Sequence, residues 1–175
     1  MLALAADLYR ARDFAAARSL LEGMIANDPG DLVAHSTAGL VCSEMGDFAA
    51  AIHHFRVVTA FDVTNTTVWL KLGAAALLDQ DHETAQFALN KAMDLDPKSA
   101  DIHHNYASLL ATLCHDHAAM HHYARAYELR PGWSEPHVGH AFCLLRQGQY
   151  KRGWAMLEKR WDKPNSGREY HGIPV

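Results

Sequence analysis

Disulfide chemistry and membrane-spanning stretches are both missing from this 175-residue sequence. Its three cysteines, Cys42, Cys114 and Cys143, are odd in number and far apart, a pattern that favours a reducing compartment over a disulfide scaffold. No apolar run approaches the roughly 20 residues of a membrane span, and no basic segment followed by an apolar core marks a secretory signal. The sequence therefore predicts a cytoplasmic protein without membrane contact.

Strong charge and a tendency to form strands are absent too. Lysine and arginine number 16 against 20 aspartates and glutamates, for a net charge of −4, whereas nucleic-acid-binding domains carry a basic patch or stripe. We therefore expect no nucleic-acid partner. Alanine is frequent, valine and isoleucine are few, and 49% of the residues are hydrophobic, so close-packed helices are expected.

The sequence also lacks the motifs of common catalytic sites. Gly139, Gly148 and Gly153 are too far apart for a phosphate-binding loop and lie in helical context. No Gly-x-Ser-x-Gly elbow occurs. We expect neither a cofactor nor enzymatic activity in this chain.

What the sequence does contain is clearest in residues 66–99, which are predicted to form two helices joined by a turn. The apolar face of the first helix consists, at spacings of i, i+3, i+4 and i+7, of Trp69, Leu72, Gly73 and Ala76. The corresponding face of the second helix consists of Ala85, Leu89, Ala92 and Met93. Pro97 ends the pair because proline cannot continue a helix. Such a pair cannot bury its apolar seam alone.

A shift of 34 residues superposes this unit on the rest of the chain. The small residue of the second helix becomes Ala17, Ala51, Ala85, Ala119 and Gly153. The small residue of the first helix becomes Ala5, Gly39, Gly73, Ala107 and Ala141. The closing proline recurs as Pro29, Pro97 and Pro131, with Val63 as a departure. Five copies remain in register without insertion or deletion.

The period, the small residues and the closing proline resemble the tetratricopeptide repeat family. The resemblance implies an all-α, right-handed α-solenoid of antiparallel helix pairs with a concave inner face. The solenoid is expected over residues 1–161. Its units are expected at 1–31, 32–65, 66–99, 100–133 and 134–161. Residues 162–175 are predicted to be an extended tail or a truncated linker.

Helix caps and turns agree with this division. Asp31, Ser99 and Ser134 precede first helices and are predicted N-caps. Two glycines ease the turn inside a unit, and other residues stand there in the remaining units at some energetic cost. The residues at this turn position are Arg12, Gly46, Gln80, Cys114 and Gly148.

The resemblance also implies a binding surface, because in that family one stripe of each first helix lines the concave groove. The stripe is unusually apolar here, and such patches often mark binding sites. The predicted partner-binding residues are Leu40, Glu44, Leu70, Ala74, Leu77, Leu78, His104, Ser108, Val138, Phe142, Leu145 and Arg146. A protein or peptide ligand is expected. Tighter packing, homo-oligomer formation or coverage by the tail are the alternatives.

The thirteen histidines raise the question of a metal site. His35, His103 and His137 fall at the same place in their units and are predicted to fill the seam between repeats. The only local cluster consists of Cys114, His115, His117 and His121. Metal sites need ligands that converge from different turns or helices, and we predict no metal.

Residues 148–161 carry a more specific pattern, G-x-Y-x-x-G-W-x-x-x-E-x-R-W. It resembles the last repeat of bacterial proteins in which these repeats precede a glycosyltransferase domain. The alternative function is therefore the acceptor-binding or docking region of a glycosyltransferase whose catalytic domain lies outside this chain. A simpler interpretation is a terminal helix on which Trp154 and Trp161 cover the end of the solenoid. Both interpretations are compatible.

Overall fold

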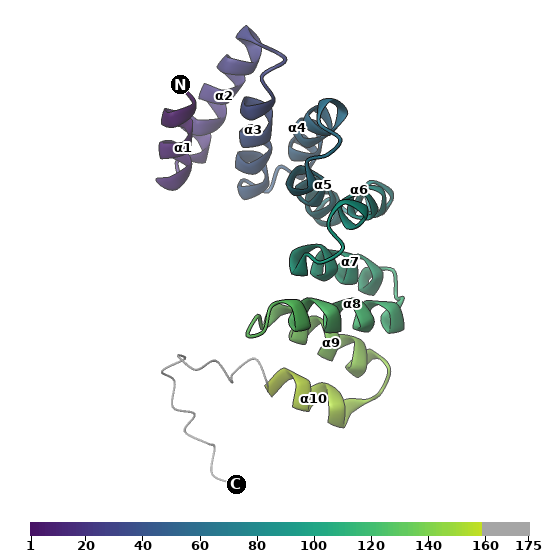
Figure 1. Ribbon diagram of the computed structural model, residues 1–175. Coiled ribbons are helices and arrows are strands. Elements are labelled where there is room, and N and C mark those ends of the chain that lie inside the picture. Colours follow the sequence, from purple (N-terminus) through teal and green to yellow (C-terminus); the bar gives the residue numbers. More distant parts are fainter. Residues whose placement is uncertain (159–175) are drawn as a thin grey trace, which may run out of the picture.

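The computed structural model describes residues 1–158, which form ten α-helices arranged along a curved arch (Figure 1). The helices are α1 Leu2–Arg10, α2 Phe14–Asn27, α3 Leu32–Glu44, α4 Phe48–Phe61, α5 Thr66–Leu78, α6 His82–Leu95, α7 Ala100–Thr112, α8 Asp116–Leu129, α9 Glu135–Arg146 and α10 Tyr150–Glu158. Successive helices form antiparallel pairs, so the predicted all-α solenoid is confirmed. Trp161 and the predicted tail 162–175 lie outside the described residues.

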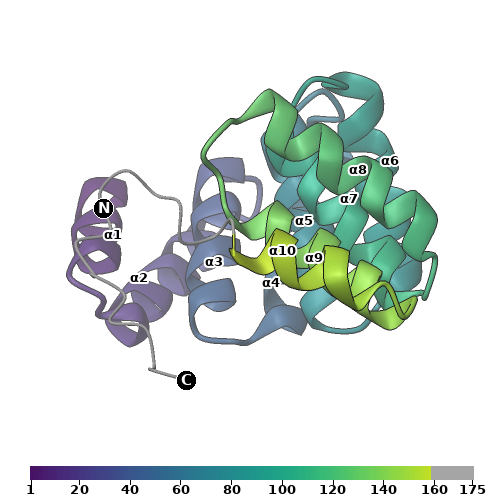
Figure 2. The same cartoon turned by 90° about the horizontal axis from the view of Figure 1, so that it is seen from below.

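The curvature follows from which helices touch. Each second helix packs against the first helix of the next unit, and first helices also touch one another, as α5 touches α7 and α7 touches α9. In the described part of the chain, no two neighbouring second helices make a comparable contact. The first helices therefore lie closer together and line the inner side of the arch. Seen from below, α7 to α10 stack on one another while α1 and α2 lie to one side (Figure 2).

The two helices of a unit meet where a small residue receives a large one. Gly39 accepts the ring of Phe55, and Gly73 accepts the side chain of Leu89. A Cβ atom on Gly73 would lie 2.6 Å from Cγ of Leu89, well inside van der Waals contact. Ala85, on the facing side of α6, is fully buried. The repeated small residues thus allow the close helix crossing that the sequence predicted.

Aspartate side chains cap four of the ten described helices. Asp31 accepts hydrogen bonds from the backbone N–H groups of Val33 and Ala34, and Ser99 accepts one from Ile102, as predicted. The prediction for Ser134 was wrong: its hydroxyl makes no cap bond and lies 3.3 Å from Oε2 of Glu135. The backbone of Ser134 is itself helical, which turns the hydroxyl away from the free N–H groups.

A second set of caps, which the sequence pattern did not predict, lies inside the units. Asp13, Asp47 and Asp81 each accept a hydrogen bond from the N–H group three residues on, at the starts of α2, α4 and α6. Each of these aspartates lies in the turn that joins the two helices of its unit, because an N-cap residue lies just outside the helix that it starts.

The predicted turn residues adopt left-handed backbone conformations. Gly46 and Gly148 have φ angles of 76° and 74°, and the side-chain-bearing residues Arg12, Gln80 and Cys114 have φ angles of 62°, 64° and 60°. A left-handed conformation costs roughly 1–2 kcal/mol for an L-residue with a Cβ atom. Three of the five units therefore carry strain at this position.

We predict that Gln80→Gly stabilises the protein by up to about 1 kcal/mol, because the strain at φ 64° is relieved while glycine adds some unfolded-state entropy. Denaturant unfolding measures this change. The converse variant, Gly46→Ala, should destabilise by a similar amount. A loss of stability in Gln80→Gly would show that the side chain of Gln80 contributes more than its backbone costs.

We predict that Gly73→Ala destabilises the protein by about 1–3 kcal/mol, because the new methyl group would overlap Leu89. The control is Gly23→Ala in α2, where a Cβ atom has no neighbour within 4 Å. Alanine at this exposed position of α2 should stabilise the protein by up to about 1 kcal/mol. Thermal unfolding of both variants separates helix propensity from packing, and equal gains in stability would contradict the close crossing.

Candidate functional site

All twelve predicted partner-binding residues lie on first helices, at the inner side of the arch. Their side chains differ in the fraction of their surface that is exposed. Leu78 and Phe142 are the most open of the apolar ones, with 62% and 57% of their surface exposed. Leu40, Leu70 and Leu77 are only partly exposed because they pack against the central core. The predicted apolar patch is therefore less continuous than the sequence indicated.

The larger hollow of this groove lies between α7 and α9 and measures about 650 Å³. It is lined by Ser108, Ala111, Thr112, Tyr123, Gly139, Phe142, Cys143, Leu145 and Arg146. Four predicted residues thus come together here. Gly139 is essential to its shape, because a Cβ atom there would lie 2.3 Å from the ring of Tyr123.

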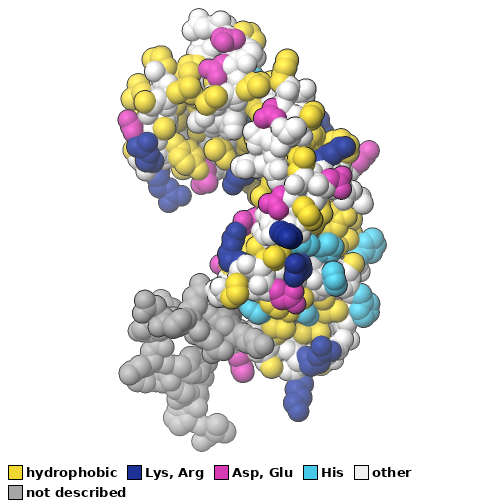
Figure 3. Space-filling view, viewed as in Figure 1, with side chains coloured by type: hydrophobic (Ala, Val, Ile, Leu, Met, Phe, Trp, Pro, Cys, Tyr) yellow, Lys and Arg dark blue, Asp and Glu magenta, His cyan; other side chains and the backbone are white. Residues whose placement is uncertain are grey.

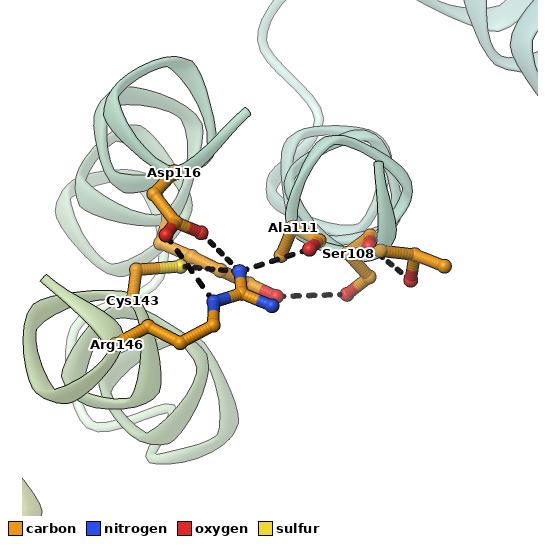
Figure 4. A network of polar contacts seen from close by, with 7 residues as sticks. Ser108, Ala111, Asp116, Cys143 and Arg146 are labelled. Carbon is orange, nitrogen blue, oxygen red and sulfur yellow. Dashed lines mark hydrogen bonds and ion pairs between the residues drawn. The ribbon is translucent and has the colours of Figure 1, made fainter. Parts of the chain in front are cut away.

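Among the described residues that line this hollow, the one charged side chain, that of Arg146, is already paired with a carboxylate of the protein. Arg146 forms a two-pronged ion pair with Asp116, at the start of α8, and donates from Nη2 to the carbonyl oxygen of Ala111 at 2.8 Å (Figure 4). Hydrogen bonds to Asp116 raise the pKa of Arg146. Nearby, the hydroxyls of Ser108 and Tyr123 lie 3.2 Å apart. The hollow is therefore predominantly apolar, with its polar groups mutually satisfied.

A second hollow of about 440 Å³ lies between α5 and α7 and has a different character. It is lined by Thr66, Thr67, Leu70, Lys71, Ala74, Asp96, Ser99, Asp101, Ile102 and Asn105. Asp101 is held by Arg130 in a two-pronged ion pair. Lys71 is exposed and has no ion pair within residues 1–158. This part of the groove combines hydroxyl groups with a free cation.

His104, another predicted residue, belongs to an aromatic cluster that the sequence did not reveal. Its ring lies 4.7 Å from that of Trp133 and 5.8 Å from that of Tyr123, centroid to centroid. Its Nδ1 atom is buried without a hydrogen-bond partner among the described residues. Burial lowers the pKa of His104, so the imidazole is neutral at pH 7. Glu44 differs again, because it accepts a hydrogen bond from the hydroxyl of Tyr9 at 3.3 Å.

A third hollow, of about 510 Å³, lies outside the groove between α4, α5 and α6. Its lining includes Trp69 and Leu72 on α5, Arg56 on α4 and Phe87 on α6. The Trp69 and Phe87 rings meet edge to face with centroids 5.7 Å apart. No pattern in the sequence predicted this hollow, because its lining comes from three helices of two neighbouring units.

The alternative metal site is not assembled. Within residues 1–158, no group of three or more histidine, cysteine, aspartate or glutamate side chains is placed to hold a metal ion. Cys114, His115, His117 and His121 therefore do not form such a cluster.

Burial raises the pKa of the Cys143 thiol to about 11, which keeps it protonated and unreactive at neutral pH. No helix in the described range has the length and apolar character needed to cross a bilayer.

Comparisons with known proteins agree with this architecture. Residues 66–99 match the sequence model of the family described as tetratricopeptide repeat. No curated protein matches the chain in sequence. The ten described helices form an α-solenoid of five helix pairs, and its central pair, residues 66–99, is the part that matches the tetratricopeptide repeat model.

Solved structures share the fold at low sequence identity. MamA from Desulfovibrio magneticus RS-1 superposes with a TM-score of 0.84 at 16% identity, covering 95% of this chain and 94% of that one. TTC0263 of Thermus thermophilus gives 0.75 at 19% identity, covering 95% and 91%. YrrB, described as a TPR protein with an unusual peptide-binding site, gives 0.73 at 17% identity, covering 93% and 84%.

We predict that Arg146→Ala destabilises the protein by roughly 1–3 kcal/mol, because Asp116 is mostly buried and would lose its partner. The matched control is Arg125→Ala, which removes a pair with Glu128 in which both side chains are well exposed. That change should cost less than about 1 kcal/mol. Chemical denaturation compares the two, and equal losses would contradict a structural role for Arg146.

Proposed function

We propose that the protein is a non-catalytic scaffold that binds a protein or peptide in the groove lined by α3, α5, α7 and α9. The observation that carries this proposal is the apolar hollow between α7 and α9, beside the exposed ring of Phe142. Apolar hollows with a few polar groups are typical of binding sites. Tetratricopeptide repeats in general bind proteins or peptides, and the solved structure of YrrB has a peptide-binding site.

The chemistry of the groove favours an amphipathic segment as ligand. The described residues that line the hollow between α7 and α9 offer no free charge, because Arg146 is paired with Asp116, so this hollow suits an apolar side chain. The neighbouring hollow offers Lys71 and hydroxyl groups, which suit polar or acidic groups. A partner with apolar and acidic residues on one face would satisfy both hollows.

We predict that Phe142→Glu weakens peptide binding about tenfold or more, equivalent to about 1.4 kcal/mol, without loss of stability. Peptides selected from a displayed random library on the wild-type protein supply the ligands, and fluorescence anisotropy measures their dissociation constants. The ring is 57% exposed, so the charge meets water in the free protein.

Phe87→Glu is the matched control for this experiment. Phe87 is 56% exposed but lies on α6, outside the groove. The Phe87→Glu variant should bind the selected peptides with the same dissociation constants as the wild-type protein. If both substitutions weaken binding equally, or neither does, the groove is not the binding site.

A second candidate function is that of a docking region of a glycosyltransferase. The pattern in residues 148–161 resembles the last repeat of bacterial proteins in which such repeats precede a glycosyltransferase domain. The observation that favours it is the outer face of α10, where Trp154 is 60% exposed beside exposed Tyr150. This apolar face offers a surface to a following domain. The reading frame beyond Val175 tests the idea: several hundred residues of alternating strands and helices would support it, and an immediate stop codon would exclude it.

A further inference from the structure

Two pairs of histidines are built into the solenoid with the same geometry, two repeats apart. In unit 32–65, Nδ1 of His35 lies 3.1 Å from Nδ1 of His54. In unit 100–133, Nδ1 of His103 lies 2.9 Å from Nδ1 of His122. In each pair the first ring is buried on the first helix and the second is half-buried on the second helix. We call these pairs the histidine clasps.

Each clasp also ties its unit to the loop before it. Nε2 of His35 lies 3.2 Å from the carbonyl oxygen of Pro29, and Nε2 of His103 lies 3.1 Å from that of Pro97. A carbonyl oxygen only accepts hydrogen bonds, so both Nε2 atoms carry a proton. The clasp therefore links three elements, namely the preceding loop, the first helix and the second helix.

This bonding fixes the protonation of both rings. Because neutral His35 carries its proton on Nε2, its Nδ1 is a bare acceptor, and Nδ1 of His54 must donate. The same holds for His103 and His122. One added proton can enter at the remaining nitrogen of the second ring and leave the N–H···N bond intact. A second proton places two N–H groups face to face, which breaks the bond and sets two cations about 3 Å apart.

In unit 66–99 the bond to the preceding loop is made by a tryptophan, which does not titrate. Trp69 occupies the place of His35 and His103, and its Nε1–H donates to the carbonyl oxygen of Val63 at 2.8 Å. Ala88 occupies the place of His54 and His122. This unit therefore has the loop bond but no clasp, and it serves as an internal control.

We infer that the histidine clasps make units 32–65 and 100–133 open in acid, while unit 66–99 between them stays closed. The groove helices α3 and α7 belong to the two acid-sensitive units, so acid loosens the inner face on both sides of its centre.

The surroundings of the clasps oppose a further positive charge. Around His54 lie His53 on the same helix, Arg18 and Glu22 on α2, and Asp47 at the start of α4; only the two carboxylates favour protonation. Around the second clasp lie His121 and Arg125 on α8, and the uncharged ring of Tyr106 on α7. Histidines also gather on the outer flank of the C-terminal half, as Figure 3 shows.

The direction of the pH dependence follows from burial. Desolvation lowers the pKa values of His54 and His103, and lowers that of His122 to about 4. The folded state thus binds fewer protons than the unfolded state below the ordinary histidine value of about 6.5. Stability from these groups is complete above that pH and is lost as the pH falls toward about 4. The hydrogen bond from Arg18 lowers the pKa of Asp47 below its ordinary value. The Asp47 cap is therefore protonated only at a lower pH than the histidines.

Hydrogen exchange at pH 7.5 and pH 4.5, corrected for intrinsic exchange rates, tests the proposal on the whole chain. Opening of α3–α4 and α7–α8 should increase about tenfold or more relative to α5–α6, since each unit of pKa shift corresponds to a factor of ten. Equal opening of all three units would overturn the proposal. The variant His54→Gln/His122→Gln, which keeps a hydrogen-bonding group that does not titrate, should reduce this difference. His53→Gln/His121→Gln, on the same helices but outside the clasps, should retain it.

A second measurement tests the proposal on the wild-type protein, so it does not depend on whether the clasp variant folds. Imidazole ¹⁵N spectra of the wild-type protein at pH 7.5 should show the proton on Nδ1 in His54 and His122, and on Nε2 in His35 and His103. Protons on Nε2 in all four rings would mean that no clasp exists, and the proposal would fail.

Discussion

The structure depends on the close approach of two helices at one small residue in every unit. Gly39 receives Phe55 and Gly73 receives Leu89, with no room for a further methyl group at either place. This contact fixes both the crossing and the register of a helix pair. Because the contact repeats every 34 residues, one local constraint sets the geometry of the whole described solenoid. The inner face is a consequence of that geometry rather than a separately folded site.

The groove is shaped by packing that also restricts it. Leu40, Leu70 and Leu77 lie on first helices, and part of the surface of each packs against the core. The larger of the two hollows along the first helices lies between α7 and α9, where the absence of a side chain on Gly139 makes room for the ring of Tyr123. The internal pairing of Arg146 with Asp116 removes the charge that would otherwise make this hollow costly to fill with an apolar group.

The periodicity of the sequence was enough to predict the helix pairs, the close crossings and the turn positions, because each is a local consequence of residue size or backbone preference. It could not predict what a side chain does once neighbouring units meet. Arg146 was expected to face a partner, but its ion pair with Asp116 spans 30 residues of sequence. Ser134 has the right residue type for a cap, and only its helical backbone rules that role out. His104 was placed on the groove stripe, while its aromatic neighbour Trp133 comes from a loop without periodicity.

The departures from the repeat are where the units acquire separate properties. The first helix of each of three central units needs a ring N–H to reach the preceding loop, and either histidine or tryptophan supplies it. Histidine leaves a second nitrogen that requires a partner, so a second histidine follows on the next helix. Tryptophan has no second polar atom, so Ala88 suffices at the partner position and Trp69 instead meets Phe87. The same exchange that removes the titratable pair thus places the Trp69 ring in the lining of the hollow between α4, α5 and α6.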